Sequence, residues 1–138
     1  MDTQRTGMTQ AVADWFGIAA STACAIHCLL IPALLVTGTI LPASFLTDEA
    51  FHQLMLLVIL PAAILAFGIG CWRHKDQWVL VLGMIGVTGM VLAVTVVHDL
   101  VGESGERIVT VLSAAVLVAA HLRNFRICRS MDCDHNHA

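Results

Sequence analysis

Four long apolar runs, separated by short polar connections, constrain the fold of this chain more than any other feature. They span residues 15–41, 51–72, 78–98 and 108–125. Each is near the ~20 residues that a helix needs to cross a ~30 Å hydrocarbon core. Only 12% of the 138 residues are charged, against about a quarter in an ordinary soluble domain. The chain is therefore predicted to be all-α: a polytopic membrane protein, a four-transmembrane-helix bundle with short loops.

The four runs leave no room for a separate soluble domain, so residues 1–138 are expected to form one membrane domain. A secretory signal peptide is the competing interpretation of the first run. Its apolar region would be about 7–15 residues long and would follow a basic segment. Here the run is much longer, and Arg5 stands against Asp2 and Asp14 in the segment before it. We therefore interpret the first run as a membrane span.

The distribution of charge predicts the orientation in the membrane better than the net charge of −3 does. Positive residues follow the second run, at Arg73 and Lys75, and lie at or after the end of the fourth run, at Arg123, Arg126 and Arg129. The other two connections are acidic and carry Asp48, Glu49, Asp99, Glu103 and Glu106 against Arg107. Because positive residues stay on the cytoplasmic side, both termini are expected in the cytoplasm and the acidic loops outside.

A cysteine pair that encloses a histidine, Cys24-Ala-Ile-His27-Cys28, lies within the first run. Residues four apart share a helix face, so the two thiols are expected to project together, with His27 beside Cys24. Thiols and imidazoles are ligands for soft and borderline metal ions. Ionisable groups inside a membrane span are costly and usually functional. A buried cysteine can also serve packing alone, but an imidazole in lipid needs partners, which favours a metal site.

Further ligand types occur toward both ends of the predicted spans. His52 and His98 stand at the outer boundary among the acidic residues, where ordinary solvated loop charge is the alternative. His121 lies inside the fourth run, where it is either a link toward the tail or a residue bonded to a neighbouring helix. The predicted cytoplasmic tail, residues 126–138, is a short Cys/His tract of a metal-binding kind, or else a solubilising tail. Its candidate ligands are Cys128, Cys133, His135 and His137.

These ligands are expected at three depths, an outer rim, a midplane pair and an inner tail, as in a relay that passes on one metal ion. No nucleotide-binding signature is present, and no enzymatic activity is expected. An odd count of five cysteines, none in a predicted outer loop, indicates free thiols. The alternatives are a membrane thiol-redox protein, a haem-binding electron carrier with His52 and His98 as ligands, and a metal sensor.

The chain resembles the MerC family of small inner-membrane proteins associated with bacterial mercury resistance. The resemblance runs from Asp14 to Cys133 and includes the cysteine pair, the basic hairpin at 72–78 and the segment 82–86. It implies transport of Hg(II) from the periplasm to the cytoplasm, with Cys24 and Cys28 as membrane ligands. Cys128 and Cys133 would be the cytoplasmic pair.

The Cys-Ala-Ile-His-Cys spacing departs from the family pattern, in which the cysteines are closer and no histidine intervenes. Zn²⁺ and Cu⁺ are therefore alternatives to Hg²⁺ as the transported ion. Expected partners are the metal ion, the lipid bilayer, a periplasmic metal donor and a cytoplasmic acceptor such as a reductase or metallochaperone. No cofactor besides the transported ion and no nucleic acid is expected, and a homodimer stays open.

Overall fold

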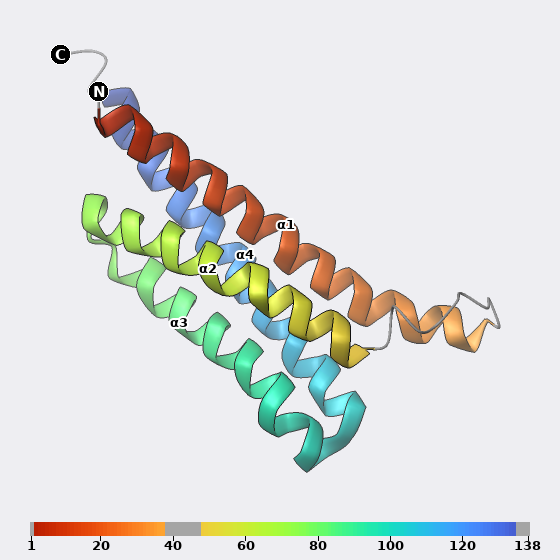
Figure 1. Ribbon diagram of the computed structural model, residues 1–138. Helices are drawn as coiled ribbons and strands as arrows, with labels where there is room; N and C mark the ends of the chain where they lie inside the picture. Colours follow the sequence, from red (N-terminus) through yellow and green to blue (C-terminus); the bar gives the residue numbers. More distant parts are fainter. Residues whose placement is uncertain (1, 38–47, 135–138) are drawn as a thin grey trace.

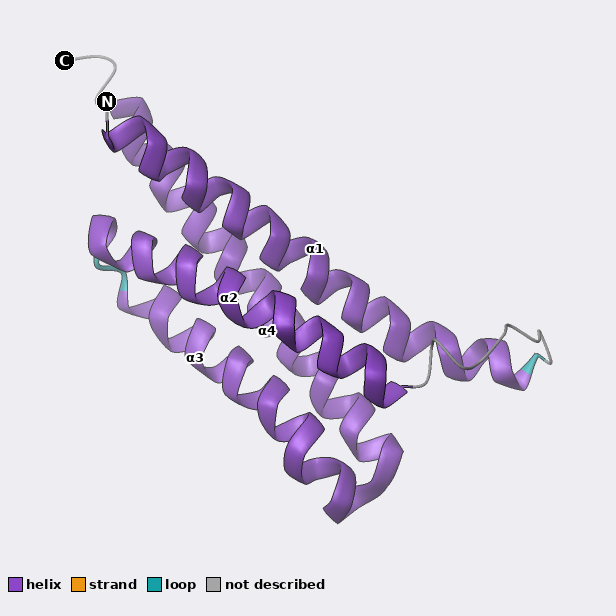
Figure 2. Ribbon diagram, in the orientation of Figure 1, coloured by secondary structure: helices purple, strands orange, loops and turns teal. Residues whose placement is uncertain are grey.

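The structure is a computed structural model and describes residues 2–37 and 48–134. These residues form four α-helices and one π-helical segment, and no strand occurs among them (Figures 1 and 2). The elements are α1 (Asp2–Val36), α2 (Asp48–His74), α3 (Gln77–Leu92), η2 (Ala93–Val97) and α4 (His98–Asp134). The all-α prediction is confirmed for the described part of the chain.

The helices lie side by side in one bundle (Figure 1). Helix α4 contacts each of the other three, and α1 packs along both α4 and α2. The first turn of α1 and the last turn of α4 lie at the same end of the bundle, together with the α2–α3 turn. We call this the terminal end. The opposite end, where α2 and α4 begin, is the distal end.

The turn between α2 and α3 is as tight as the sequence predicts. α2 ends at His74 and α3 begins at Gln77. Lys75 has a positive φ of 52°, and Asp76 caps α3 by accepting a hydrogen bond from the Val79 N–H at 3.1 Å. A capping carboxylate satisfies one of the backbone donors that the start of a helix leaves open. The cap therefore fixes the point at which the chain turns back.

The distal end has a second reversal, in which η2 leads directly from α3 into α4. Gly102, with φ 72° and ψ −174°, breaks the helical geometry of α4 one turn after its start. That conformation is essentially restricted to glycine. The sequence predicts an outer turn at residues 101–105, and the structure has a break in helical geometry within that range, at Gly102. The π-helical segment has no sequence signal that predicts it.

Three helical segments in the described part of the chain are long and apolar enough to cross a membrane. They are Gly7–Ile31, Phe51–Gly70 and Gln77–Ser130. The sequence predicts four spans, whereas the structure has the last two as one segment of 54 residues. The reason is that α3, η2 and α4 follow one another without a gap, and the non-helical backbone between them is confined to a kink at Gly102.

Helix α1 begins well before the apolar run that predicts it. The run starts at Trp15, but the helix starts at Asp2 and ends at Val36. The early turns are stabilised by packing, since the side chains of Gln10, Ala13 and Asp14 are buried. Tertiary burial therefore outweighs the polar composition of this segment.

The glycines of α3 allow close helix contact, as their spacing predicts. A Cβ at Gly83 would meet the Phe67 ring of α2, and one at Gly86 would meet Leu117 of α4. The bundle exterior is apolar and carries exposed Leu57, Ile64, Met84, Ile85 and Leu112. On helices of a soluble monomer the outward face is normally polar. The exposed side chains therefore suit lipid rather than water.

Candidate metal site

Cys24 and Cys28 lie on the face of α1 that is turned into the bundle. Their spacing of four residues places both thiols on the same side of the helix. Both side chains are buried, and both are free thiols. The same buried face continues toward the terminal end with Ser21 and Gly17. The two sulfurs therefore face the interior and not the lipid.

His52 of α2 brings a third ligand atom to this pair. Its Nε2 lies 3.0 Å from the Cys28 Sγ. The ligand atoms of Cys24, Cys28 and His52 all lie within 4.8 Å of one another, and the three residues are buried. The sequence predicts His52 at a different depth from the cysteines. The structure joins them, because α1 runs about two turns beyond Cys28 before it ends, so that the start of α2 lies level with the pair.

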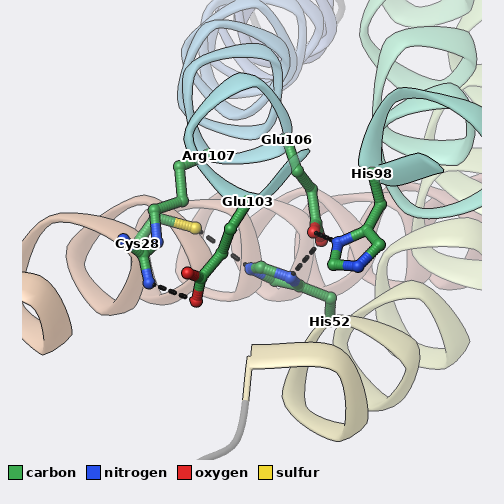
Figure 3. A network of polar contacts seen from close by, with 6 residues as sticks. All are labelled: Cys28, His52, His98, Glu103, Glu106 and Arg107. Atoms are coloured by element: carbon green, nitrogen blue, oxygen red, sulfur yellow. Dashed lines mark hydrogen bonds and ion pairs between the residues drawn. The ribbon is translucent and has the colours of Figure 1, made fainter. Parts of the chain in front are cut away.

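Glu106 of α4 holds His52 in this position (Figure 3). The His52 Nδ1 lies 2.9 Å from one carboxylate oxygen of Glu106, and the His98 Nδ1 lies 2.6 Å from the other. Because an ionised carboxylate only accepts hydrogen bonds, both Nδ1 atoms donate. The Nε2 of a neutral His52 then carries the lone pair and points at the Cys28 thiol. A carboxylate that fixes a histidine tautomer in this way is the usual support of a metal-binding imidazole.

The surroundings of Glu106 connect the buried group with the surface. Glu106 is buried, whereas the His98 side chain is 51% exposed. On the same turn of α4, Arg107 donates to Glu103 at 2.6 Å (Figure 3). The sequence groups Glu106 with the acidic rim. In the structure Glu106 is instead buried and contacts His52, whose other ring nitrogen contacts the Cys28 thiol.

His27 is not part of the group of three. Its ring is buried and stacks on the Phe51 ring, with centroids 3.8 Å apart and an interplanar angle of 14°. It also lies edge-on to the His52 ring at 6.0 Å. The sequence predicts His27 beside Cys24 as a ligand. In the structure its ring packs against the start of α2 instead, next to the site.

Two sulfurs and one imidazole nitrogen form a donor set with well-defined chemistry. Two thiolates alone suit a very soft ion in linear coordination, since thiolates are the preferred ligands of such ions. Two thiolates, one imidazole and one open position are the catalytic type of zinc site. The group could therefore hold a thiophilic ion of either kind, with Glu106 as the support of its imidazole.

A second buried polar cluster lies toward the terminal end, and Asp14 of α1 is at its centre. The His121 Nδ1 lies 2.9 Å from the Asp14 Oδ1, and the Asn124 amide donates to both carboxylate oxygens, at 3.1 and 2.9 Å. Gln10 donates to Oδ2 at 2.7 Å. Asn124 also donates to the Ala66 carbonyl at 3.1 Å. We call Gln10, Asp14, His121 and Asn124 the Asp14 cluster.

The remaining predicted ligands lie at or beyond the end of α4. The side chain of Cys128 is buried one turn after Asn124. Cys133 belongs to the last turn of α4, and its side chain is outside the described part of the structure. His135 and His137 lie outside the described residues. The structure therefore has residues 126–134 of the predicted tail as part of α4, and Cys128 is the candidate ligand there whose side chain it describes.

Sequence reasoning missed Asp14 and underrated Glu106. By composition Asp14 belongs to the polar flank before the first span, although it continues the face of Gly17, Ser21 and Cys24 at steps of three and four residues. That periodicity is the signal that could have found it. Glu106 has no such local signal, because its partners come from α2 and from the start of α4.

The fold and the site together define a class: a helical membrane protein with several apolar helices and a buried cysteine–histidine group able to hold a metal ion. The model of the family described as "MerC mercury resistance protein" matches residues 14–126. Since this match covers most of the chain, the protein belongs to the MerC family. No curated protein and no solved structure among those compared matches the chain.

Proposed function

We propose that this protein carries a thiophilic metal ion across the bacterial inner membrane, from the periplasm to the cytoplasm, by exchange between cysteine and histidine ligands. Hg(II) is the first candidate, on the basis of the family. Zn(II) and Cu(I) are the alternatives, because the site adds an imidazole to the two thiols. The observation that carries the proposal is the buried group of Cys24, Cys28 and His52, with ligand atoms within 4.8 Å of one another.

The proposed topology has four passes, with the terminal end in the cytoplasm. The chain reverses at the α2–α3 turn and again at Gly102. The segment Gln77–Ser130 is much longer than the ~20 residues of a single span, so two passes fit it. The basic residues Arg123 and Arg126 lie toward the terminal end of α4, which agrees with a cytoplasmic location there.

Ligand exchange needs a site that opens toward one side and a further acceptor toward the other. His98 is half exposed and shares Glu106 with His52, so it is the proposed first contact for an arriving ion. Cys24 and Cys28 then lose their protons as they bind the ion, because a thiolate is the binding form. Cys128, buried near the terminal end, is the proposed later acceptor. Cys133, His135 and His137 extend this set in the proposed tail.

Metal uptake into proteoliposomes tests the proposal. Wild-type protein is expected to accumulate Hg(II) inside the vesicles, and the Cys24→Ser/Cys28→Ser variant is expected to lose that accumulation. Cys71→Ser is the matched control, since it removes one thiol of α2 and leaves the group intact. Equal accumulation with and without Cys24 and Cys28 would refute the proposal.

The same assay identifies the cargo when it is run in parallel with Zn(II) and Cu(I). His52→Ala removes the only nitrogen ligand of the group. It is expected to reduce Zn(II) accumulation more than Hg(II) accumulation, because two thiolates alone satisfy the softer ion. An equal effect on both ions would show that His52 does not contribute to the choice between them.

A further inference from the structure

We propose that the buried imidazole of His121 is a second ligand station for the transported ion, between the thiols and the terminal end. This inference rests on the proposed function, since it concerns the route of the same ion. It assigns a binding role to the Asp14 cluster, which is separate from the group of Cys24, Cys28 and His52.

The first observation is that one arrangement occurs twice in the bundle. At the distal site a buried carboxylate, Glu106, receives the Nδ1–H of His52, and the Nε2 of His52 faces a thiol. In the Asp14 cluster a buried carboxylate, Asp14, receives the Nδ1–H of His121. A carboxylate at Nδ1 raises the basicity of the imidazole and leaves Nε2 as the ligand atom. Both histidines are therefore prepared to bind an ion through Nε2.

The second observation is that the Nε2 of His121 has no polar partner within the described residues. His121 is 0% exposed, and its Nε2 has no hydrogen-bond partner among the described residues. A buried polar atom without a partner lowers stability, so its persistence calls for a functional reason. The ring is held between the Phe67 ring, at a centroid distance of 4.5 Å, and the backbone of α1 at Gly17. A Cβ at Gly17 would lie 2.2 Å from Nε2, so only glycine admits the ring here.

The third observation concerns charge. Asp14 is fully buried, and no Lys or Arg side chain in the described part of the chain forms an ion pair with it. Two of its donors, the amides of Asn124 and Gln10, carry no charge. The third, His121, carries none in its neutral form. A buried carboxylate strongly favours a nearby cation, because charges interact more strongly in a medium of low dielectric constant. A metal ion on the His121 Nε2 would provide that positive charge.

The position of His121 fits a step after the thiols. Gly17, against which its ring lies, is seven residues before Cys24 on the same face of α1, or ~10 Å at 1.5 Å per residue. Ser21 lies between them on that face, and its buried hydroxyl also lacks a partner among the described residues. An ion that leaves Cys24 toward the terminal end therefore meets one hydroxyl and then the imidazole. Sites of moderate affinity in series allow an ion to enter and also to leave.

The test follows a single turnover of the full-length protein in proteoliposomes with Hg(II) as the probe. The mercury–thiolate absorption band reports loading of Cys24 and Cys28, and its decay reports departure of the ion. His121→Gln keeps a side-chain amide that can donate to Asp14 but removes the imidazole ligand. It is expected to leave band formation unchanged and to slow the decay and the accumulation by about tenfold or more, the effect of roughly 1.4 kcal/mol.

The control is Ser113→Ala, which changes another buried polar residue of α4 and is expected to behave as wild type. His121→Asn is a second amide variant, used if His121→Gln lowers the melting temperature. Wild-type decay and accumulation in the amide variants would overturn the role of His121, while thiol-dependent uptake by the wild type would still support the proposed function. The role of His121 would also be overturned if both variants slowed band formation and band decay to the same extent and had a lowered melting temperature. That result would indicate a structural role.

Discussion

Among single residues, Glu106 has a central position in the site. Its buried carboxylate accepts hydrogen bonds from two imidazoles that belong to different helices. Glu106→Gln replaces one accepting oxygen by a donor, so that one of the two histidines loses its support. The change is expected to lower the affinity of the thiol site for Zn(II) by about 10- to 100-fold, the usual effect of removing such a support. Competition titration with a chelating dye measures it.

Glu103→Gln is the matched control for this prediction. Glu103 lies one turn earlier on α4, is exposed and is paired only with Arg107 among the described residues. It is expected to leave the Zn(II) affinity within a factor of about two, since an exposed pair contributes little. The prediction is wrong if the two variants behave alike.

At this scale the sequence predicts what is local and misses what depends on tertiary packing. The thiols of Cys24 and Cys28 share a face because four residues make about one helical turn. Whether His27 or His52 joins them depends on where α2 packs, which no spacing within the first run encodes. The sequence could identify all the ligand types of the site, but it could not assign the third ligand or the carboxylate behind it.

At the scale of helices, α3 packs closely on its neighbours through glycine. A Cβ at Gly86 would lie 2.6 Å from the Leu117 Cγ and 3.2 Å from the Leu117 backbone N. Gly86→Ala is therefore expected to destabilise the bundle by ~1–3 kcal/mol, as overpacking usually does. Denaturant unfolding in detergent, followed by circular dichroism, measures the change.

Gly68 of α2 provides the contrast, because a Cβ there would meet nothing within 4 Å. Gly68→Ala is expected to stabilise the protein slightly, by about 0.5–1 kcal/mol, since alanine loses less backbone entropy in a helix. A Gly86→Ala variant as stable as Gly68→Ala would contradict the close contact between α3 and α4.

The start of α3 is also tied to α4 by an ion pair between Asp76 and Arg123 at 2.9 Å. The Arg123 guanidinium lowers the pKa of Asp76 below its ordinary value of 3.8. A carboxylate with a lowered pKa contributes stability above its ordinary pKa, and the contribution is lost as the pH falls through the folded-state value. Asp76→Asn is therefore expected to lower the melting temperature at pH 7 and to match the wild type in strong acid. A difference that persists unchanged at low pH would contradict this.

The elements themselves were largely predictable. The hairpin at Lys75–Asp76 and the reversal at Gly102 follow from short polar connections and from glycine. The early start of α1 was not predictable from hydropathy, because Asp14 is stabilised there by His121 and Asn124 of α4, and Gln10 donates to Asp14. The η2 segment had no local signal either.

At the scale of the whole molecule, the arrangement of the helix ends makes a topological prediction. With four passes, Lys75 and the end of α4 lie on one side of the membrane and Gly102 lies on the other. Cysteine-reactive labels that do not cross the membrane measure this in a variant without native cysteines. Lys75→Cys is expected to react only after the cells are opened, and Glu103→Cys in intact spheroplasts. Labelling of both from the same side would rule out two passes in Gln77–Ser130.

The wide turn of η2 determines the direction of the side chain that follows it. A π-helical turn contains one residue more than an α-helical turn, and one residue of an α-helix corresponds to a rotation of about 100°. Removing a residue between Ala93 and Val97 would leave the length and hydropathy of the helix almost unchanged. It would nevertheless rotate His98 away from Glu106 and leave His52 as the only imidazole on that carboxylate. A shift in the phase of one helix, with no change in any ligand, would thus disconnect the buried thiols from the surface.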